Sequence, residues 1–236
     1  MPKFQELSAF AEAMAPVINA ANVNVHASAT RAVADLSTAY GLTPGLLSDL
    51  RFSLPLRPLT RRGLGVLFRY GDVEGDLLDH LRQGALVEDP DGVLRLTEGG
   101  RDFIHGLYEV HAAAVERVWA GSDLGETAEL VGRVVDAAER LPGGAFELVS
   151  PPYEPEGASP GLLLFNRLAV LRYHRADAHA AAWQAAGLSA AEIVGLMDGP
   201  LRAGIEADTN RRAGRIYRAL SERERDTLYE TLLKLI

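Results

Sequence analysis

The sequence contains no cysteine. This absence excludes disulfides, thiolate nucleophiles and metal sites with cysteine ligands. Long apolar runs are also missing, since none approaches the roughly 18–20 residues that a membrane-spanning helix needs. The N-terminal segment MPKFQELSAFAEAMAPVINA keeps a helical period and includes two glutamates, so it does not resemble a signal peptide. We therefore expect a soluble, cytoplasmic protein that has no membrane partner.

Motifs of enzymes and of cofactor-binding proteins are scarce as well. There is no G-x-S-x-G sequence and no pattern typical of a catalytic triad. Neither glycine pair, at 99–100 or at 143–144, follows a strand and opens a βαβ unit, so they do not predict a dinucleotide or phosphate loop. We therefore expect no catalytic residues and no cofactor, and we predict that the protein is not an enzyme.

Positive charge is in deficit, because the net charge is −8. That sign is unfavourable for a chain coated with nucleic acid along its length. The charge is unevenly distributed, however: between Arg51 and Tyr70 there are five arginines and no acid, whereas Asp72 to Asp91 holds seven acids and one arginine. The sequence therefore predicts a basic block beside an acidic one.

Helical periodicity fills most of the chain. Residues 4–40 form an alanine-rich amphipathic stretch, which Pro16 is expected to break or kink into two helices. Further helices in the first half are predicted at about 43–53, 60–69, 72–84, 98–120 and 121–141. Residues 85–97 change to a period of two around the turn Asp89-Pro90-Asp91-Gly92, which predicts a β-hairpin. We expect a mainly α protein with a winged helix-turn-helix module over residues 43–120.

A resemblance to a known family supports this module. The segment LLDHLRQGALVEDPDGVLRLTEGGRDF, residues 77–103, resembles the MarR-type regulators in the leucines of its short helix, the glycine before the first strand and the LT-x-x-G sequence after the second. The resemblance implies that the helix before the hairpin enters the major groove of double-stranded DNA. It is more specific for the fold than for the activity.

The second half is predicted to be a separate helical domain. We expect a first domain over 1–141, a Pro/Gly-rich linker at 142–160 and a second domain over 161–236, with helices at about 161–186, 189–198, 201–219 and 221–235. Weak similarity between the halves, which pairs Trp119 with Tyr217, suggests a degenerate internal repeat whose second copy lacks the winged helix. The chain would then be a monomeric pseudo-dimer, with a homodimer as the alternative. The segment LRYHRADAHAAAWQAAGLSAAEI also resembles an actinobacterial family of helical proteins that carry a winged helix.

The basic block supplies most of the candidate DNA-binding residues. They are Arg57, Arg61, Arg62 and Arg69 for phosphates, His80 and Gln83 on the groove-facing helix, and Arg95 on the wing. Asp72, Glu74 and Asp76 open that helix, and carboxylates near phosphates weaken binding. The acidic turn therefore argues against DNA binding, and the alternative is a winged helix kept as a scaffold.

A second cluster, Arg172, His174, Asp177 and His179, is the candidate ligand-binding site. His174 and Asp177 share a helix face at i, i+3, so we expect the carboxylate to raise the pKa of His174. The two histidines are five residues apart, which is not the i, i+4 pair of a helical zinc site, and a metal would need further ligands such as His26 or His111. We predict no metal; the alternative to a ligand site is an ordinary ion pair on the helix surface.

Three functions remain open on the sequence alone. The first is a MarR-like transcriptional regulator that binds DNA through one winged helix and a small apolar or aromatic effector in a helical pocket. The second is a helical ligand-binding protein or enzyme with a vestigial winged helix. The third is an interaction scaffold that uses the winged helix for dimerisation.

Overall fold

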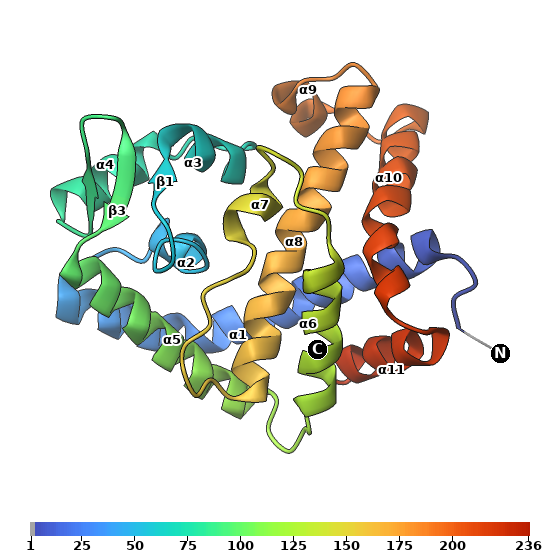
Figure 1. Ribbon diagram of the computed structural model, residues 1–236, viewed down its shortest axis with the longest axis horizontal. Coiled ribbons are helices and arrows are strands. Elements are labelled where there is room, and N and C mark those ends of the chain that lie inside the picture. The colour runs from blue at the N-terminus through green and yellow to red at the C-terminus, as the bar shows by residue number, and fades with distance from the viewer. Residues whose placement is uncertain (1–2) are drawn as a thin grey trace.

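The computed structural model describes residues 3–236 and is mainly helical, with one small antiparallel sheet (Figure 1). In chain order the elements are α1 (Leu7–Tyr40), α2 (Leu47–Leu50), β1 (Leu59–Thr60), α3 (Arg61–Leu67), α4 (Glu74–Arg82), β2 (Leu86–Glu88), β3 (Val93–Leu96), α5 (Glu98–Val118), α6 (Gly125–Ala137), α7 (Ala145–Val149), α8 (Pro160–Ala185), α9 (Ala190–Gly195), α10 (Pro200–Ala213), the 3-10 helix η1 (Gly214–Ala219) and α11 (Glu222–Leu233). The mainly α prediction is confirmed.

Helix α1 is one continuous helix, so the predicted division at Pro16 is wrong. Pro16 lies on the exposed side of α1, as does Glu12, whose carbonyl loses its helical hydrogen bond and can be solvated instead. The opposite side is buried through Phe10, Met14 and Val17. Burial of this apolar face outweighs the one hydrogen bond that the proline removes.

The predicted hairpin is present, and a third strand joins it. Strand β3 lies in the middle of the sheet, antiparallel to both β1 and β2. In the turn, the carboxylate of Asp89 accepts hydrogen bonds from the backbone N–H groups of Asp91 and Val93. The side chain of Thr97 then caps α5 by accepting from the N–H of Gly100. A Cβ at Gly100 would collide with the carbonyl oxygen of Ala85, which explains the glycine in the LT-x-x-G sequence.

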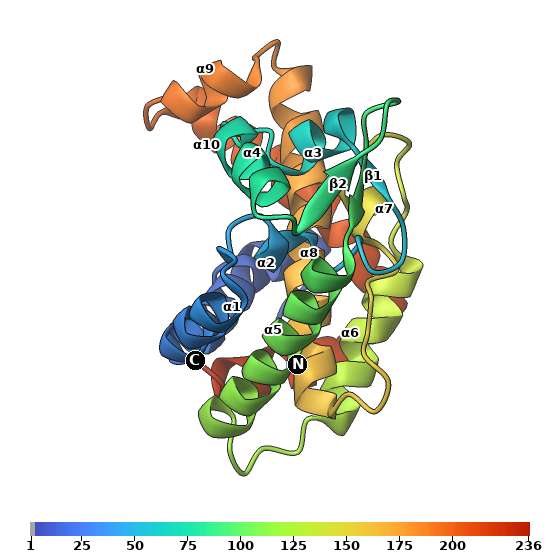
Figure 2. The same ribbon diagram turned by 90° about the vertical axis from the view of Figure 1, so that its left-hand side faces the viewer.

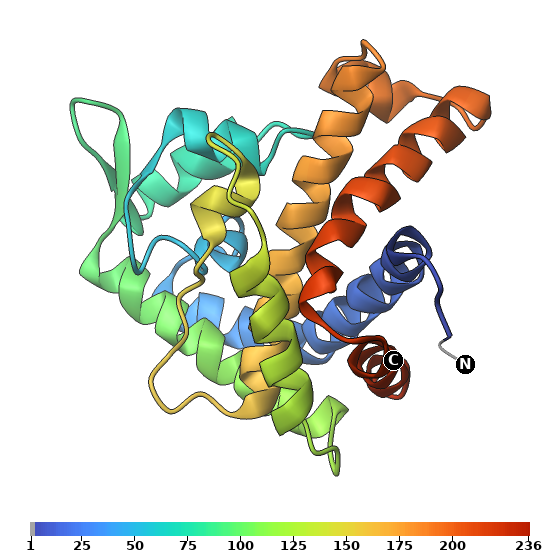
Figure 3. The same cartoon turned by 45° about the vertical axis from the view of Figure 1, so that its right-hand side comes forward.

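Helix α8 is the central element of the helical part and lies against α1, α6, α7 and α10 (Figure 3). Ser159 caps it and Pro160 occupies its first turn. Leu164, Leu168 and Leu171 are completely or almost completely buried. Helix α8 therefore brings its polar side chains next to several other elements at once.

Both predicted domains contribute to one hydrophobic core. Helix α1 packs on α5 at one end and on α10, η1 and α11 at the other (Figures 1 and 2). The predicted linker, 142–160, contains α7, whose Phe146 and Val149 are buried in the same core. Trp119 and Tyr217 are both buried near the ends of their helices, and the internal repeat stays a prediction. Among residues 3–236 no helix combines the length and the apolarity needed to cross a bilayer.

Candidate functional site

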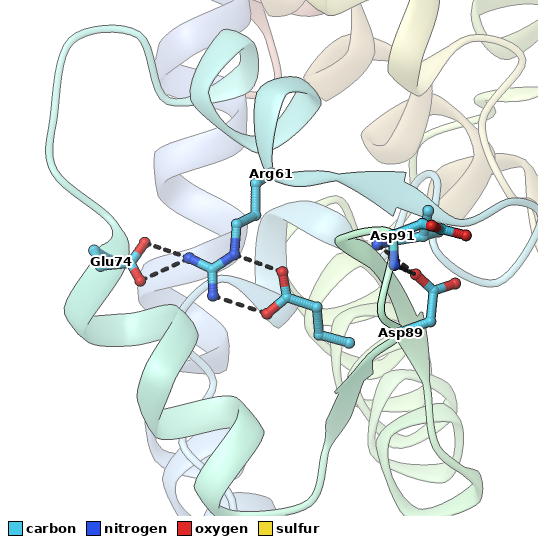
Figure 4. Close-up of polar contacts among 6 residues, drawn as sticks. Arg61, Glu74, Asp89 and Asp91 are labelled. Atoms are coloured by element: carbon cyan, nitrogen blue, oxygen red, sulfur yellow. Dashed lines mark hydrogen bonds and ion pairs between the residues drawn. The ribbon is translucent and has the colours of Figure 1, made fainter.

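Arg61, a predicted phosphate-binding residue, is held between two glutamates of its own segment. Its Nη1 donates to Glu74 at 2.7 Å and its Nε donates to Glu88 at 2.6 Å. Figure 4 shows this arginine between α4, which carries Glu74, and the turn end of the hairpin, where β2 ends at Glu88. Hydrogen bonds to both carboxylates raise the pKa of Arg61. A phosphate could reach this guanidinium only by displacing a carboxylate.

Two more arginines of the basic block face the second half of the chain. Arg69 forms an ion pair with Asp177 of α8, in which both side chains are largely buried. Arg57 donates to the backbone carbonyls of Ser150 and Pro151. These contacts connect the sheet-containing segment to α8 and to the predicted linker.

The groove-facing candidates also have partners inside the protein. His80 is completely buried, and its Nε2 accepts a hydrogen bond from the backbone N–H of Leu46. Burial lowers the pKa of His80, so the ring is neutral. The side-chain oxygen of Gln83 accepts from the backbone N–H and the hydroxyl of Thr43. His80 is therefore inaccessible to a base edge in this conformation, whereas Gln83 is exposed and keeps its side-chain NH2 group available.

The surface of this segment is therefore dominated by acids. Asp72, Glu74 and Asp76 are exposed at the start of α4. Arg95 on the hairpin lies 3.7 Å from Asp89, and Arg62 is exposed on α3. Of the seven predicted DNA-binding residues, Arg62 is the one that has neither an ion pair nor a side-chain hydrogen bond with the described residues.

The ligand-binding candidates of α8 do not form one cluster. Asp177 accepts hydrogen bonds from the backbone N–H groups of Ala145 and Phe146, at 2.9 and 2.8 Å, in addition to its ion pair with Arg69. This carboxylate therefore fastens the start of α7 to α8. Its role in this conformation is structural.

The expected increase in the pKa of His174 is wrong. Burial lowers this pKa to about 4, and the charge of Asp177 offsets the effect only in part. The carboxylate is shared with Arg69 and with backbone donors, and His174 packs edge-on against the ring of Phe146 at 5.4 Å. The side chain of His174 is therefore a neutral imidazole that packs against an aromatic ring.

The other two candidates, Arg172 and His179, line a cleft of about 350 Å³ between α1, α8 and α10. Tyr70, from the sheet-containing segment, closes one side, and its hydroxyl lies 3.0 Å from Nδ1 of His179. Glu206 of α10 lies 3.6 Å from Nε2 of the same ring. The remaining lining residues are Ala15, Asn19, Arg175, Ala176 and Thr209. We call this space the α1/α8 cleft.

One buried group was not singled out from the sequence as a site residue. Arg51, at the C-terminus of α2, is only 1% exposed. Its Nη1 donates to the carbonyl oxygen of Ser48, and its guanidinium lies 4.2 Å from the centre of the Phe52 ring. Among the described residues no carboxylate forms an ion pair with it, and its Nε and Nη2 have no acceptor. The position of an arginine inside the apolar run LLSDLRFSLPL was the sequence signal for this burial.

Two histidines lie near Arg51. His26 of α1 and His111 of α5 are in contact through Nδ1 and Nε2, 3.2 Å apart, and both rings pack against Phe165. Burial and the positive charge of Arg51 lower the pKa of His26 to about 4 and that of His111 to about 2. Both imidazoles are therefore neutral near pH 7. Within residues 3–236 no three histidine or acidic side chains are placed to hold a metal ion.

Two tyrosines complete these surroundings. The hydroxyl of Tyr108 donates to the backbone oxygen of Tyr153 at 3.0 Å, and Asn166 lies beside it. Burial raises the pKa of Tyr108 and of Tyr173, so both phenols are protonated. The four side chains His26, His111, Tyr108 and Tyr173 are therefore uncharged, while the nearby carboxylate of Asp49 counters part of the desolvation that lowers the pKa of Arg51.

Comparisons with known proteins do not add a relative to this description. No family model matches the chain, and neither a curated protein nor a solved structure matches it. The geometry of the site is therefore the basis for inferring function.

Proposed function

We propose that this protein binds a small organic molecule in the α1/α8 cleft and that the predicted winged helix acts as a wall of this site. The observation that carries the proposal is the composition of the cleft. Its volume of about 350 Å³ lies in the range of small-molecule sites, and it combines an aromatic ring, Tyr70, with the polar groups Arg172 and His179. Two of these three residues, Arg172 and His179, are also ligand-binding candidates on the sequence alone.

The contacts of the sheet-containing segment support the same conclusion. Tyr70 receives a hydrogen bond from Trp183 of α8 at 3.2 Å, and Arg69 pairs with Asp177, six residues earlier on that helix. The segment is thereby fixed against α8 by polar contacts as well as by the core. A wall fixed in this way preorganises the cleft for a ligand.

The proposal can be tested with a neutral aromatic probe, 3-phenylpropanamide. We expect it to raise the melting temperature by an amount that grows with the logarithm of one plus the ratio of its concentration to Kd. The variant Ala176→Phe, which fills the cleft, is expected to abolish this increase. Ala181→Phe is the matched control, because Ala181 lies on α8 but lines other hollows. No stabilisation of the wild type, or equal stabilisation of the Ala176→Phe variant, would contradict the proposal.

A second candidate function, the MarR-like regulator, is favoured by the order of elements. Helices α2, α3 and α4, the sheet order β1-β3-β2 and the long helix α5 follow one another as in a winged helix-turn-helix. For DNA to bind, Arg61 would have to leave Glu74 and Glu88, and the exposed acids at the start of α4 would have to approach phosphates.

The two candidate functions predict different results in a DNA-binding experiment. Under our proposal the wild type binds a mixed-sequence duplex no better at low salt than at high salt, and Arg61→Ala with Arg62→Ala changes nothing. A regulator would instead bind more tightly as salt falls, and the double variant would reduce the slope of log K against log salt by roughly one per lost phosphate contact. A fluorescence anisotropy titration at several salt concentrations measures both quantities.

A further inference from the structure

One of the arginines that line the α1/α8 cleft has no partner in the fold. Arg172 is exposed on α8, and within residues 3–236 its guanidinium forms neither an ion pair nor a hydrogen bond. A guanidinium carries five N–H donors in a planar fork. The cleft therefore contains a set of cationic donors that a ligand can use without displacing a group of the protein.

A second arginine of the cleft, Arg175, follows one turn later on α8. Its Nη2 lies 3.4 Å from a carboxylate oxygen of Glu206 on α10. Its Nη1 is buried and has no acceptor among the described residues. A buried donor without an acceptor is unfavourable, and more so when the group is charged. A ligand oxygen that accepts from this Nη1 would remove that cost.

The side chains that line the cleft carry a net positive charge. Arg172 and Arg175 contribute two positive charges, and Glu206 contributes the single negative charge among the lining residues. Burial lowers the pKa of His179, and the opposing effect of Glu206 is countered by three nearby arginines, so this ring is neutral near pH 7. The cleft therefore has an excess of one positive charge.

The other end of the cleft is aromatic. Tyr70 is 41% exposed, and its hydroxyl is already used, because it accepts from the indole N–H of Trp183 and contacts Nδ1 of His179. Tyr70 therefore offers a ligand its ring rather than its hydroxyl. Arg172 and His179 are seven residues apart on α8, which corresponds to about 10 Å along the helix axis. A cationic end and an aromatic end are thus separated by the length of a small organic molecule.

We infer that Arg172, assisted by Arg175, binds the carboxylate of an organic acid whose apolar part lies beside Tyr70 in the α1/α8 cleft. The inference rests on the proposed function and names its ligand class. A planar carboxylate matches the excess of one positive charge and can accept two parallel hydrogen bonds from one guanidinium. A doubly charged phosphate ester would leave one negative charge uncompensated near Glu206.

The test compares 3-phenylpropanoate with the neutral probe 3-phenylpropanamide, which has the same shape, by isothermal titration calorimetry at neutral pH. In the wild type we expect the acid to bind about five- to tenfold more tightly, because hydrogen bonds between charged groups are the stronger ones and solvent screens them only in part. Arg172→Met is expected to abolish this preference by weakening the binding of the acid alone, while Arg172→Lys retains part of it. Arg215→Met is the matched control, because Arg215 is also exposed and lines a different cavity.

The outcomes distinguish the ligand class from the site itself. Equal binding of both probes by the wild type overturns the carboxylate inference and leaves the cleft as a binding site, whereas binding of neither probe overturns the proposed function as well. An acid preference that survives in Arg172→Met, or that is lost in Arg215→Met, places the carboxylate elsewhere and overturns the inference. An equal loss of affinity for both probes in Arg172→Met also overturns it, because Arg172 would then shape the cleft rather than bind the charge.

Discussion

Replacement of Asp177 by alanine is expected to lower the free energy of unfolding by about 3–5 kcal/mol, the cost typical of breaking a buried ion pair. The change removes the partner of Arg69, which is left largely buried and charged. It also removes the acceptor for the backbone N–H groups of Ala145 and Phe146. A Cβ at Gly144 would lie 2.7 Å from the same carboxylate, so the chain is closely fitted around it.

Urea unfolding of matched variants measures this effect. Asp177→Asn keeps an acceptor for the backbone and loses the charge, so an intermediate loss is expected. Asp208→Ala is the control, because Asp208 pairs with Arg211 and Arg212 on the more exposed helix α10. Such a pair is worth about 0–1 kcal/mol. If Asp177→Ala lowers the free energy of unfolding by less than about 1 kcal/mol, the contacts of Asp177 do not stabilise the fold as proposed.

Acidification from pH 6.5 towards pH 5 is expected to destabilise the folded protein. Burial lowers the pKa of His26 and His174 to about 4 and of His111 to about 2, and His80 and His179 shift in the same direction. In the unfolded chain these rings take up protons near pH 6.5, whereas in the folded protein each ring takes up its proton only at a lower pH. The unfolded state therefore binds more protons, and each such ring costs up to about 1.4 kcal/mol per pH unit in this window.

Melting temperatures measured between pH 7.5 and pH 5 report on this effect, because most carboxylates titrate only at lower pH. His111→Gln is expected to reduce the slope, because one buried neutral imidazole is removed. His105→Gln, at an exposed position, should leave the slope as in the wild type. A melting temperature that does not change over this range would contradict the neutral buried histidines.

Local signals account for the parts of the fold that the sequence predicted well. The hairpin was predicted from its turn. The hydrogen bonds accepted by the Asp89 carboxylate and the positive φ of Gly92 involve only five consecutive residues, 89–93. Helix α8 begins and ends within one residue of its predicted limits, because its cap and its first-turn proline are local features. Strand β1 was missed, since two residues have no detectable period and their pairing with β3 is a tertiary contact.

The candidate site was less predictable because it depends on contacts between distant segments. Spacing along α8 correctly placed His174 and Asp177 near each other, but Arg69, more than a hundred residues earlier, determines how the carboxylate is used. The burial of Arg51 is likewise set by α1, α5 and α8, and no pattern near Arg51 encodes their arrangement. Sequence analysis had considered His26 and His111 only as additional metal ligands.

The packing of α1 against the last helices has a consequence for the order of events during synthesis. Phe10 lies edge-on to the ring of Tyr217 at 4.8 Å, and Phe4 lies 5.0 Å from that of Tyr229. These partners are translated roughly two hundred residues after α1, and translation proceeds at about 5–20 residues per second. For roughly ten to forty seconds the apolar face of α1 is therefore without its C-terminal cover. During that interval the exposed apolar face is prone to aggregation, and the complete core forms only after α11 has left the exit tunnel.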